Sequence, residues 1–340
     1  MKRKTYIDIA KGIATILVII GHCNYTNSKL VAWLYTFHMP LFFIINGLFI
    51  SLNKYPTLKD FTKKKAKSLL IPYFILSIPT FICSIALEVV KTKAIDIGYI
   101  FNRFIGIFIG WRKTEFDNGM WFILALFLSD ILVYMILKYV EDNKKIKNNN
   151  KIIILSLINI ILFTIGVIIT KFVKGFVWSI DVVPVCASFV LIGYLLNKLN
   201  DKKNIFSNNK IGILMILINV VFGYLNYKLV GRSDIHGSNL GNGFYYLLSA
   251  IAGSVFIIYL SKMINTNKIL ETIAKHSLSY YALQGIALPI AKNGIEFIFK
   301  ILKINNINII IWVLTIIISM IILEASSRIL EKLLPKIFKK

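Results

Sequence analysis

The segment DIAKGIATILVIIGHC, Asp8 to Cys23, decides the fold class and contains the first candidate site residues. Its apolar length suits the hydrocarbon core of a bilayer. At about 100° per residue, the eleven steps from Lys11 to His22 return to within about 20° of the starting direction, and Asp8 falls within about 40° of His22. One face of a predicted membrane helix therefore carries an acid, a base and an imidazole, which are costly there and usually functional. Alternatively, Asp8 and Lys11 flank the span and pair with each other.

Composition extends this prediction to the whole chain. Of 340 residues, 57% are hydrophobic, and the mean hydropathy is +0.71, which is typical of a polytopic membrane protein. The net charge of +24 comes from lysines in short loops, as is usual in membrane proteins, and we expect no nucleic acid partner. The three cysteines lie in apolar stretches without CxxC spacing, so no metal site is predicted.

Hydrophobic runs predict an all-α, polytopic integral membrane helical bundle of about ten spans. The segment 97–110 is too short to span and is expected to be interfacial or re-entrant. We expect a single domain over 1–340 and no separate soluble domain. The predicted spans are 6–24, 30–52, 68–90, 119–140, 152–173, 176–197, 211–230, 243–261, 269–291 and 306–327.

The loops alternate in positive charge along the chain. Lysine-rich segments precede span one, follow spans two, four and six, and end the sequence. The positive-inside rule then places both termini in the cytoplasm. The bias toward Ile, Lys and Asn suggests an AT-rich bacterial genome, and we expect a multi-pass protein of the bacterial cytoplasmic membrane.

This orientation places polar groups from four spans at one depth, in the outer half of the membrane. We expect them to converge there, although contacts cannot be derived from a single sequence. The residues concerned are His22, His38, Asp117, Asn118, Trp121 and Gln284.

Five motifs follow one another along the chain: IDIAKGIATILVIIGH (7–22), FHMPLFFIINGLF (37–49), KKKAKSLLIPYF (63–74), NGMWFILALF (118–127) and AKHSLSYYALQ (274–284). In this order they resemble the acyltransferase 3 family of integral membrane acyltransferases, over the whole chain. The subgroup suggested acetylates polysaccharides and is similar to fucose 4-O-acetylase-like proteins. Lys11 stands where the family more often has Arg, which loses the bidentate fork. Gln284 stands where the late motif often has His.

The resemblance implies transfer of an acyl group, usually acetyl, from a cytoplasmic coenzyme A thioester to a sugar hydroxyl outside. Acetyl-CoA would be the donor substrate, with no permanently bound cofactor, and a polysaccharide the acceptor. A hydroxyl needs a general base with a pKa near the working pH, and histidine fits. We expect His22 to be that base or a transient acyl carrier. His38 is a second catalytic candidate or a structural histidine. Asp8 and Lys11 would tune or position the site.

Candidate binding residues lie at both membrane faces. Lys64 and Lys67, at the cytoplasmic end of span three, could hold the phosphates of coenzyme A, or serve orientation and lipid headgroups. On the acceptor side we expect Asn118, Trp121 and Arg103, although tryptophan is ordinary at an interface. Arg103, Arg112, Glu115 and Asp117 of the outer loop could line the side where the sugar enters, although for most of them a solvated loop is expected.

Two other functions fit the sequence. A polysaccharide exporter or flippase would also need many spans with polar residues inside. An acyltransferase for a small-molecule acceptor is the second alternative. The lipid bilayer, acyl-CoA and a glycan are the expected partners, with a polysaccharide synthase complex or a homodimer as further options.

Overall fold

The computed structural model describes residues 5–23, 28–117, 119–303 and 308–335. Within these ranges every regular element is a helix. In chain order they are α1 (Thr5–His22), α2 (Ser28–Tyr35), α3 (His38–Gly47), α4 (Leu58–Lys65), η1 (Ala66–Leu70), α5 (Ile71–Thr92), α6 (Ile97–Ile109), α7 (Trp121–Asp142), α8 (Asn148–Phe172), η2 (Val177–Val182), α9 (Val183–Lys203), η3 (Ile205–Ser207), α10 (Asn209–Val230), α11 (Gly243–Ile264), α12 (Lys268–Ile301) and α13 (Asn308–Leu333).

Nine helical stretches of the described chain are long and apolar enough to cross a membrane. The all-α, polytopic prediction is confirmed, with one span fewer than the ten expected. The missing one, 269–291, does form a helix within α12. Polar residues such as Ser277 and Gln284 lower its mean hydropathy, and both line internal cavities where α12 packs among α1, α5 and α13. Segment 97–110 forms the short apolar helix α6.

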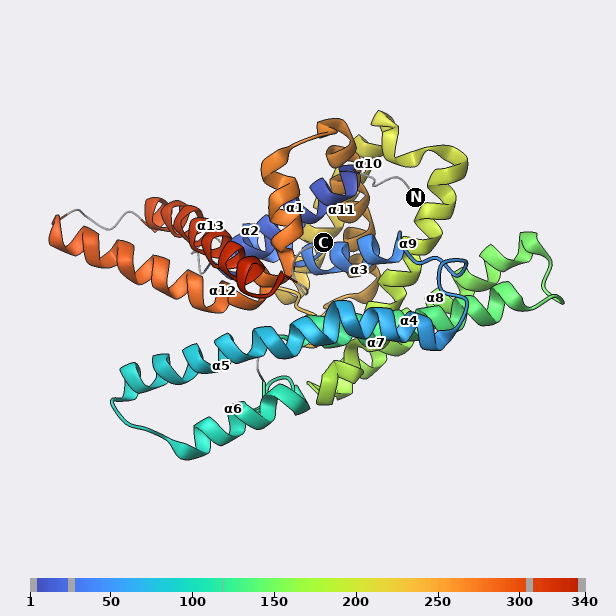
Figure 1. Ribbon diagram of the computed structural model, residues 1–340. Coiled ribbons are helices and arrows are strands. Elements are labelled where there is room, and N and C mark those ends of the chain that lie inside the picture. Colours follow the sequence, from blue (N-terminus) through green and yellow to red (C-terminus); the bar gives the residue numbers. More distant parts are fainter. Residues whose placement is uncertain (1–4, 24–27, 118, 304–307, 336–340) are drawn as a thin grey trace.

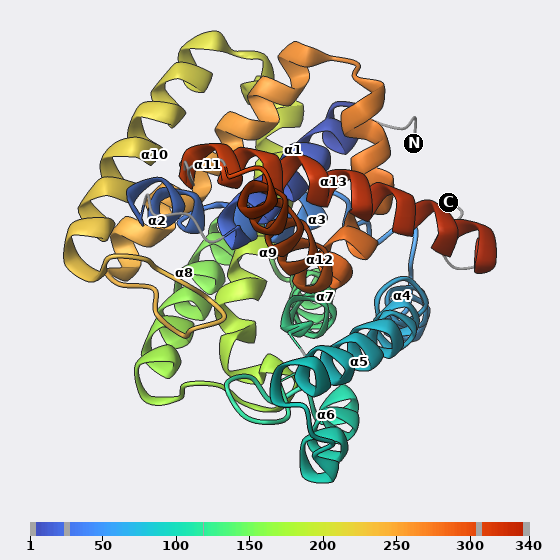
Figure 2. The ribbon, with the colours of Figure 1, turned by 90° about the vertical axis from the view of Figure 1, so that its left-hand side faces the viewer.

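Two helical pairs project from the main bundle (Figures 1 and 2). The pair α5–α6 and the pair α12–α13 extend toward the left of Figure 1, and α5 contacts α12. The main bundle contains α1, α3, α9 and α11, and α1 packs against both α11 and α12. Helix α1 is therefore surrounded by other helices, so its polar side chains face protein or cavity instead of lipid.

Glycines allow the closest helix contact in the main bundle. A Cβ atom added at Gly47 of α3 would collide with the carbonyl oxygen of Val190, and one at Gly193 of α9 with that of Ile44. Small residues at such a crossing let two membrane helices pack backbone to backbone. This contact fixes α3, which carries His38 at its first position.

The second span is interrupted between α2 and α3. Pro40 lacks an N–H group and so removes one helical hydrogen bond near the break. The chain tightens there, since the N–H groups of Thr36 and Phe37 bond to carbonyls three residues back. The break turns the His38 ring back onto the preceding helix, where its Nδ1–H donates to the Leu34 carbonyl over 2.7 Å. The Leu34 carbonyl therefore accepts two hydrogen bonds at the break, from Phe37 N–H and from the His38 ring.

Candidate functional site

The largest polar cavity, here called the histidine cavity, has a volume of about 720 Å³. It lies where α1, α3, α5, α6 and α12 meet the segments before α7 and α11. Its polar lining includes three of the four histidines of the chain. The polar and charged lining residues that matter below are His22, His38, Arg103, Lys113, Glu115, Asp117, Trp121, Arg232, Asp234, His236 and Gln284.

His22 and His38 share the same local geometry. Each Nδ1–H donates to the backbone carbonyl four residues earlier, His22 to Val18 over 2.9 Å and His38 to Leu34 over 2.7 Å. A carbonyl can only accept, so these bonds leave Nε2 of each neutral ring as a lone-pair acceptor. His22 is exposed, whereas His38 is fully buried. His22 is therefore the ring that a substrate can reach from the cavity.

An aromatic ring connects the two histidines. The His22 and His38 ring centroids lie 6.5 Å apart, and Tyr35 packs edge-on to His38 at 4.6 Å. The guanidinium of Arg232 lies 4.6 Å from the Tyr35 centroid, a cation–π contact. Arg232 thus brings positive charge close to the two imidazoles.

A third imidazole enters the cavity from the loop between α10 and α11. Nε2 of His236 lies 2.9 Å from Oδ2 of Asp117, and the backbone N–H groups of Lys113 and Gly119 donate to the same carboxylate, each over 2.9 Å. Burial raises the pKa of Asp117, but these hydrogen bonds outweigh burial and hold the pKa below its usual value. Asp117 is therefore an ionised acceptor that fixes the His236 ring.

Arg112 holds this loop in place. The expectation that most charges of this loop are solvated does not hold for Arg112, which is only 1% exposed. Its guanidinium pairs with Asp181 and donates to the backbone carbonyls of Ile235 and His236. A buried guanidinium that pairs with a carboxylate and donates to two carbonyls is a rigid anchor. The loop that carries His236 is therefore tied to the loop that carries Asp117.

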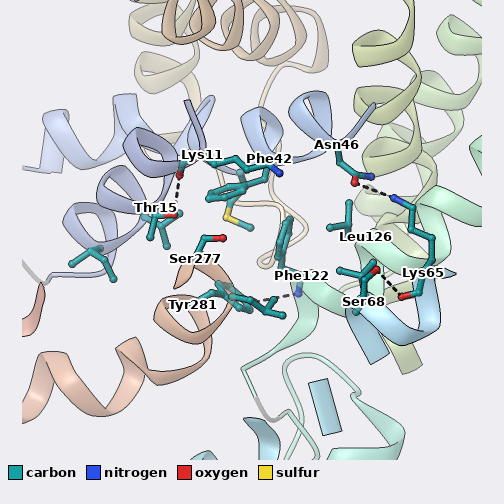
Figure 3. Close-up of a pocket in the computed structure, with 15 residues that line it drawn as sticks. Lys11, Thr15, Phe42, Asn46, Lys65, Ser68, Phe122, Leu126, Ser277 and Tyr281 are labelled. Carbon is teal, nitrogen blue, oxygen red and sulfur yellow. Dashed lines mark hydrogen bonds between the residues drawn. The ribbon is translucent and has the colours of Figure 1, made fainter. Parts of the chain in front are cut away.

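A second cavity, here called the lysine cavity, has a volume of about 200 Å³ (Figure 3). Its lining combines apolar side chains with Lys11 and Thr15 of α1, Asn46 of α3, and Lys65 and Ser68 near η1. Figure 3 shows these side chains approaching from opposite sides, with Phe42 and Phe122 between them. The cavity is narrow, mainly apolar and bordered by two cations.

Lys65 is held by a buried carboxylate. Its Nζ lies 2.7 Å from Oδ2 of the fully buried Asp130 and donates to Oδ1 of Asn46 over 3.1 Å. The Asn46 amide N–H group donates in turn to Asp130. Directly after Lys65, the π-helix η1 inserts an extra residue into the turn, a distortion frequent at functional sites.

The two cavities share Met39 and Tyr281 as lining residues. The hydroxyl of Tyr281 donates to the Gly119 carbonyl and accepts from the Phe122 N–H, each over 3.2 Å. The Phe122 ring packs edge-on to Tyr281 with centroids 5.4 Å apart. Met39, Phe122 and Tyr281 therefore form a partition, so named below, that separates the cavities by the thickness of a few side chains.

The structure brings together most of the polar groups expected to converge. His22, His38 and Trp121 line the histidine cavity with Arg103, which donates to the Asp117 backbone carbonyl. Asn118 lies outside the described residues. Lys11 lines the lysine cavity instead, because eleven residues of helix advance about 16 Å.

The other predicted site residues lie apart from both cavities. Asp8 is half-buried on α1, one turn before Lys11, and lines neither cavity. Lys64 and Lys67 are exposed and also line neither. Their neighbours Lys65 and Ser68 point into the lysine cavity.

Sequence reasoning missed His236, Arg232 and Lys65. His236 and Arg232 belong to a short loop without hydrophobic periodicity, so no pattern marks them. One signal was available: the chain has only four histidines, and all of them can be considered as site candidates. In the described part of the chain no three His, Cys, Asp or Glu side chains form a set that could hold a metal ion.

Comparison with known families gives one match. A family model described as an acyltransferase domain, that of the acyltransferase 3 family, matches residues 4–324. No curated protein matches the chain, and no solved structure does. The matched region includes all the described residues of both cavities. The chain therefore belongs to the acyltransferase 3 family and is a multi-pass membrane acyltransferase.

Proposed function

We propose that the protein transfers an acetyl group from acetyl-CoA on the cytoplasmic side to a hydroxyl of a cell-surface polysaccharide. The observation that carries this proposal is the meeting of two unlike cavities at the partition. The lysine cavity is the donor side and the histidine cavity is the acceptor side. Both termini, with the lysine-rich loops, then lie in the cytoplasm of a bacterial cell, and the whole chain acts as one domain.

The size of the lysine cavity favours a slender donor arm. Pockets for drug-sized ligands measure about 300–1,000 Å³, and this cavity is about 200 Å³. It suits the acylated pantetheine arm, while the nucleotide stays outside near the exposed Lys64 and Lys67. Lys11 and Lys65 border the arm, and the partition is where the thioester would meet the histidine cavity.

The lining of the histidine cavity favours a neutral, hydroxyl-rich acceptor. Its fixed charges balance, with Arg103, Lys113 and Arg232 against Glu115, Asp117 and Asp234. Trp121 lines the cavity wall, where the exposed part of its indole can pack against a sugar ring. A balanced set of donors and acceptors around an aromatic ring suits a sugar better than a strongly charged acceptor.

His22 supplies the chemistry in this proposal. Its Nε2 is a lone-pair acceptor within the cavity, so it acts as general base for the sugar hydroxyl or as transient acyl carrier. The acyl carbon would reach this ring by crossing the partition from the lysine cavity. Either step suits a neutral imidazole near pH 7.

The test is coenzyme A release by purified protein in nanodiscs with acetyl-CoA, together with acetylation of surface polysaccharide. We expect both in the wild type and neither in His22→Ala. His276→Gln is the matched control, since that histidine lies outside both cavities and bonds to Glu324 and Glu331. Wild-type protein that releases no coenzyme A would refute the proposal. Loss of polysaccharide from the surface of a deletion strain would instead indicate an exporter.

A further inference from the structure

The Asp117–His236 pair has a geometry that the proposed function does not yet use. The carboxylate accepts three hydrogen bonds: from Nε2 of His236, from Lys113 N–H and from Gly119 N–H. Since Nε2–H donates to Asp117, the other ring nitrogen, Nδ1, carries the lone pair. No described residue bonds to that Nδ1, and the ring lines the histidine cavity. A carboxylate that fixes one ring nitrogen leaves the other free to accept a proton.

The surroundings hold this imidazole rigidly although it is on a loop. Arg112 donates to the carbonyls of Ile235 and His236, and Lys113 Nζ donates to the Gly237 carbonyl over 3.0 Å. The Asp234 carboxylate accepts from the His236 backbone N–H over 3.0 Å. Such constraint is typical of a group that must meet a reacting atom with little freedom.

The ring also lies beside the proposed sugar platform. The centroids of His236 and Trp121 are 5.8 Å apart, and the side chain of His236 is 32% exposed. His22 lines the same cavity from α1. A sugar seated on Trp121 would therefore lie between two imidazoles that come from segments far apart in the sequence.

We propose that His236 is the base for the acceptor hydroxyl, that Asp117 positions it, and that His22 acts on the acyl side; this inference rests on the proposed function. Nδ1 of His236 takes the hydroxyl proton while the sugar oxygen forms a bond to the acyl carbon. The bond from that carbon to the nitrogen of His22, which took the acyl group from the sulfur of coenzyme A in the first half of the reaction, breaks. The leaving group keeps the electron pair and receives the proton, which regenerates His236.

The test separates the donor and acceptor halves of the reaction. The donor half is release of coenzyme A from acetyl-CoA without acceptor: His22 Nε2 takes the acyl group, and the sulfur leaves with the electron pair and a proton. The acceptor half is transfer to surface polysaccharide purified from a strain that lacks this chain. We expect His236→Gln, whose amide still donates to Asp117, to slow transfer by about 10²–10³-fold and leave the donor half within about twofold. Asp117→Asn slows transfer about tenfold or more, because the ring loses its fixed tautomer.

Chemical rescue distinguishes a base from a structural residue. In His236→Ala, added imidazole restores part of the transfer rate, which it cannot do if the ring only supports the loop. A matched variant is Asn239→Ala, on the same loop but outside the cavity lining, which transfers normally. Normal transfer by His236→Gln, equal loss of both halves, or failure of imidazole rescue overturns the inference. Those results, obtained beside an active wild type, leave the proposed function standing; an inactive wild type defeats both.

Discussion

The two cavities differ in how their ionisable groups are satisfied. In the histidine cavity, hydrogen bonds fix one nitrogen of each of the three imidazoles and leave the second as a lone-pair acceptor. In the lysine cavity, Lys65 is neutralised by Asp130, and Lys11 Nζ lies 5.2 Å from the Phe49 ring centroid. An imidazole with a lone pair on one nitrogen can accept a proton or an acyl group. A lysine that is already paired with a carboxylate can instead stabilise the cavity and bind a ligand. Substitutions should therefore change turnover in the first cavity and stability or donor affinity in the second.

The largest expected effect comes from His22→Gln. Glutamine can keep the bond to the Val18 carbonyl but has no basic nitrogen, so kcat should fall by about 10²–10⁴-fold. Because the ring is exposed, thermal unfolding should stay at the wild-type temperature. Steady-state kinetics in nanodiscs checks both. If kcat fell by less than tenfold, the histidine cavity would not be the one whose side chains determine turnover.

Asp130→Ala should affect stability strongly. The substitution leaves Lys65 without its buried partner, and breaking such a pair costs about 3–5 kcal/mol. We expect about 3 kcal/mol, because the Lys65 side chain is 16% exposed and can turn toward water. Unfolding in detergent gives the measurement. Asp142→Ala, which breaks the exposed pair with Lys138, is the matched control and should cost less than about 1 kcal/mol. Equal shifts would show that burial of Asp130 has no energetic consequence.

Ser277→Phe tests whether the lysine cavity is the path of the acyl donor. The serine lines the lysine cavity, and a phenyl ring there would occupy much of its volume. We expect kcat/KM for acetyl-CoA to fall about tenfold, and more for longer acyl groups, with unchanged folding. Ser156→Phe on α8 lines neither cavity and should match the wild type. If donors of every length were used normally, the lysine cavity would not be the donor path.

The smallest effect is expected for Lys64→Ala and Lys67→Ala. Both side chains are exposed, so each contact with a phosphate would contribute about 0.2–1 kcal/mol and weaken with salt. KM for acetyl-CoA should rise by less than about fivefold at low salt and return toward the wild-type value at high salt. A large rise that salt does not reduce would assign these lysines to a buried site.

Local signals in the sequence account for the helices and for much of the histidine cavity. Apolar length predicts the spans, and helical spacing places Lys11 and His22 on one face. The structure shows that these two side chains do not share a site, since Lys11 lines the lysine cavity and His22 lines the histidine cavity. The charge alternation that placed His38 and Gln284 at the depth of His22 led to residues that do share one cavity.

The remaining features depend on contacts that no local pattern encodes. His236 pairs with Asp117, 119 residues earlier, and a polar loop offers no periodicity to align them. Lys65, instead of Lys64 or Lys67, reaches the lysine cavity beside η1, because its ammonium group pairs with the buried Asp130 of another helix. Arg112 looks like a loop cation until Asp181 and two backbone carbonyls surround it.

The partition of Met39, Phe122 and Tyr281 also bears on the electrical integrity of the membrane. With the donor and acceptor sides proposed above, the cavities on its two sides shorten the insulating path to a few side chains. Each elementary charge that crosses 100 mV releases about 2.3 kcal/mol, so a continuous file of water here would let ions dissipate the membrane potential. In the proposed reaction, an aromatic and thioether barrier would exclude hydrated ions while a small uncharged acyl group passes. An enzyme that works across a charged membrane must be an insulator as well as a catalyst.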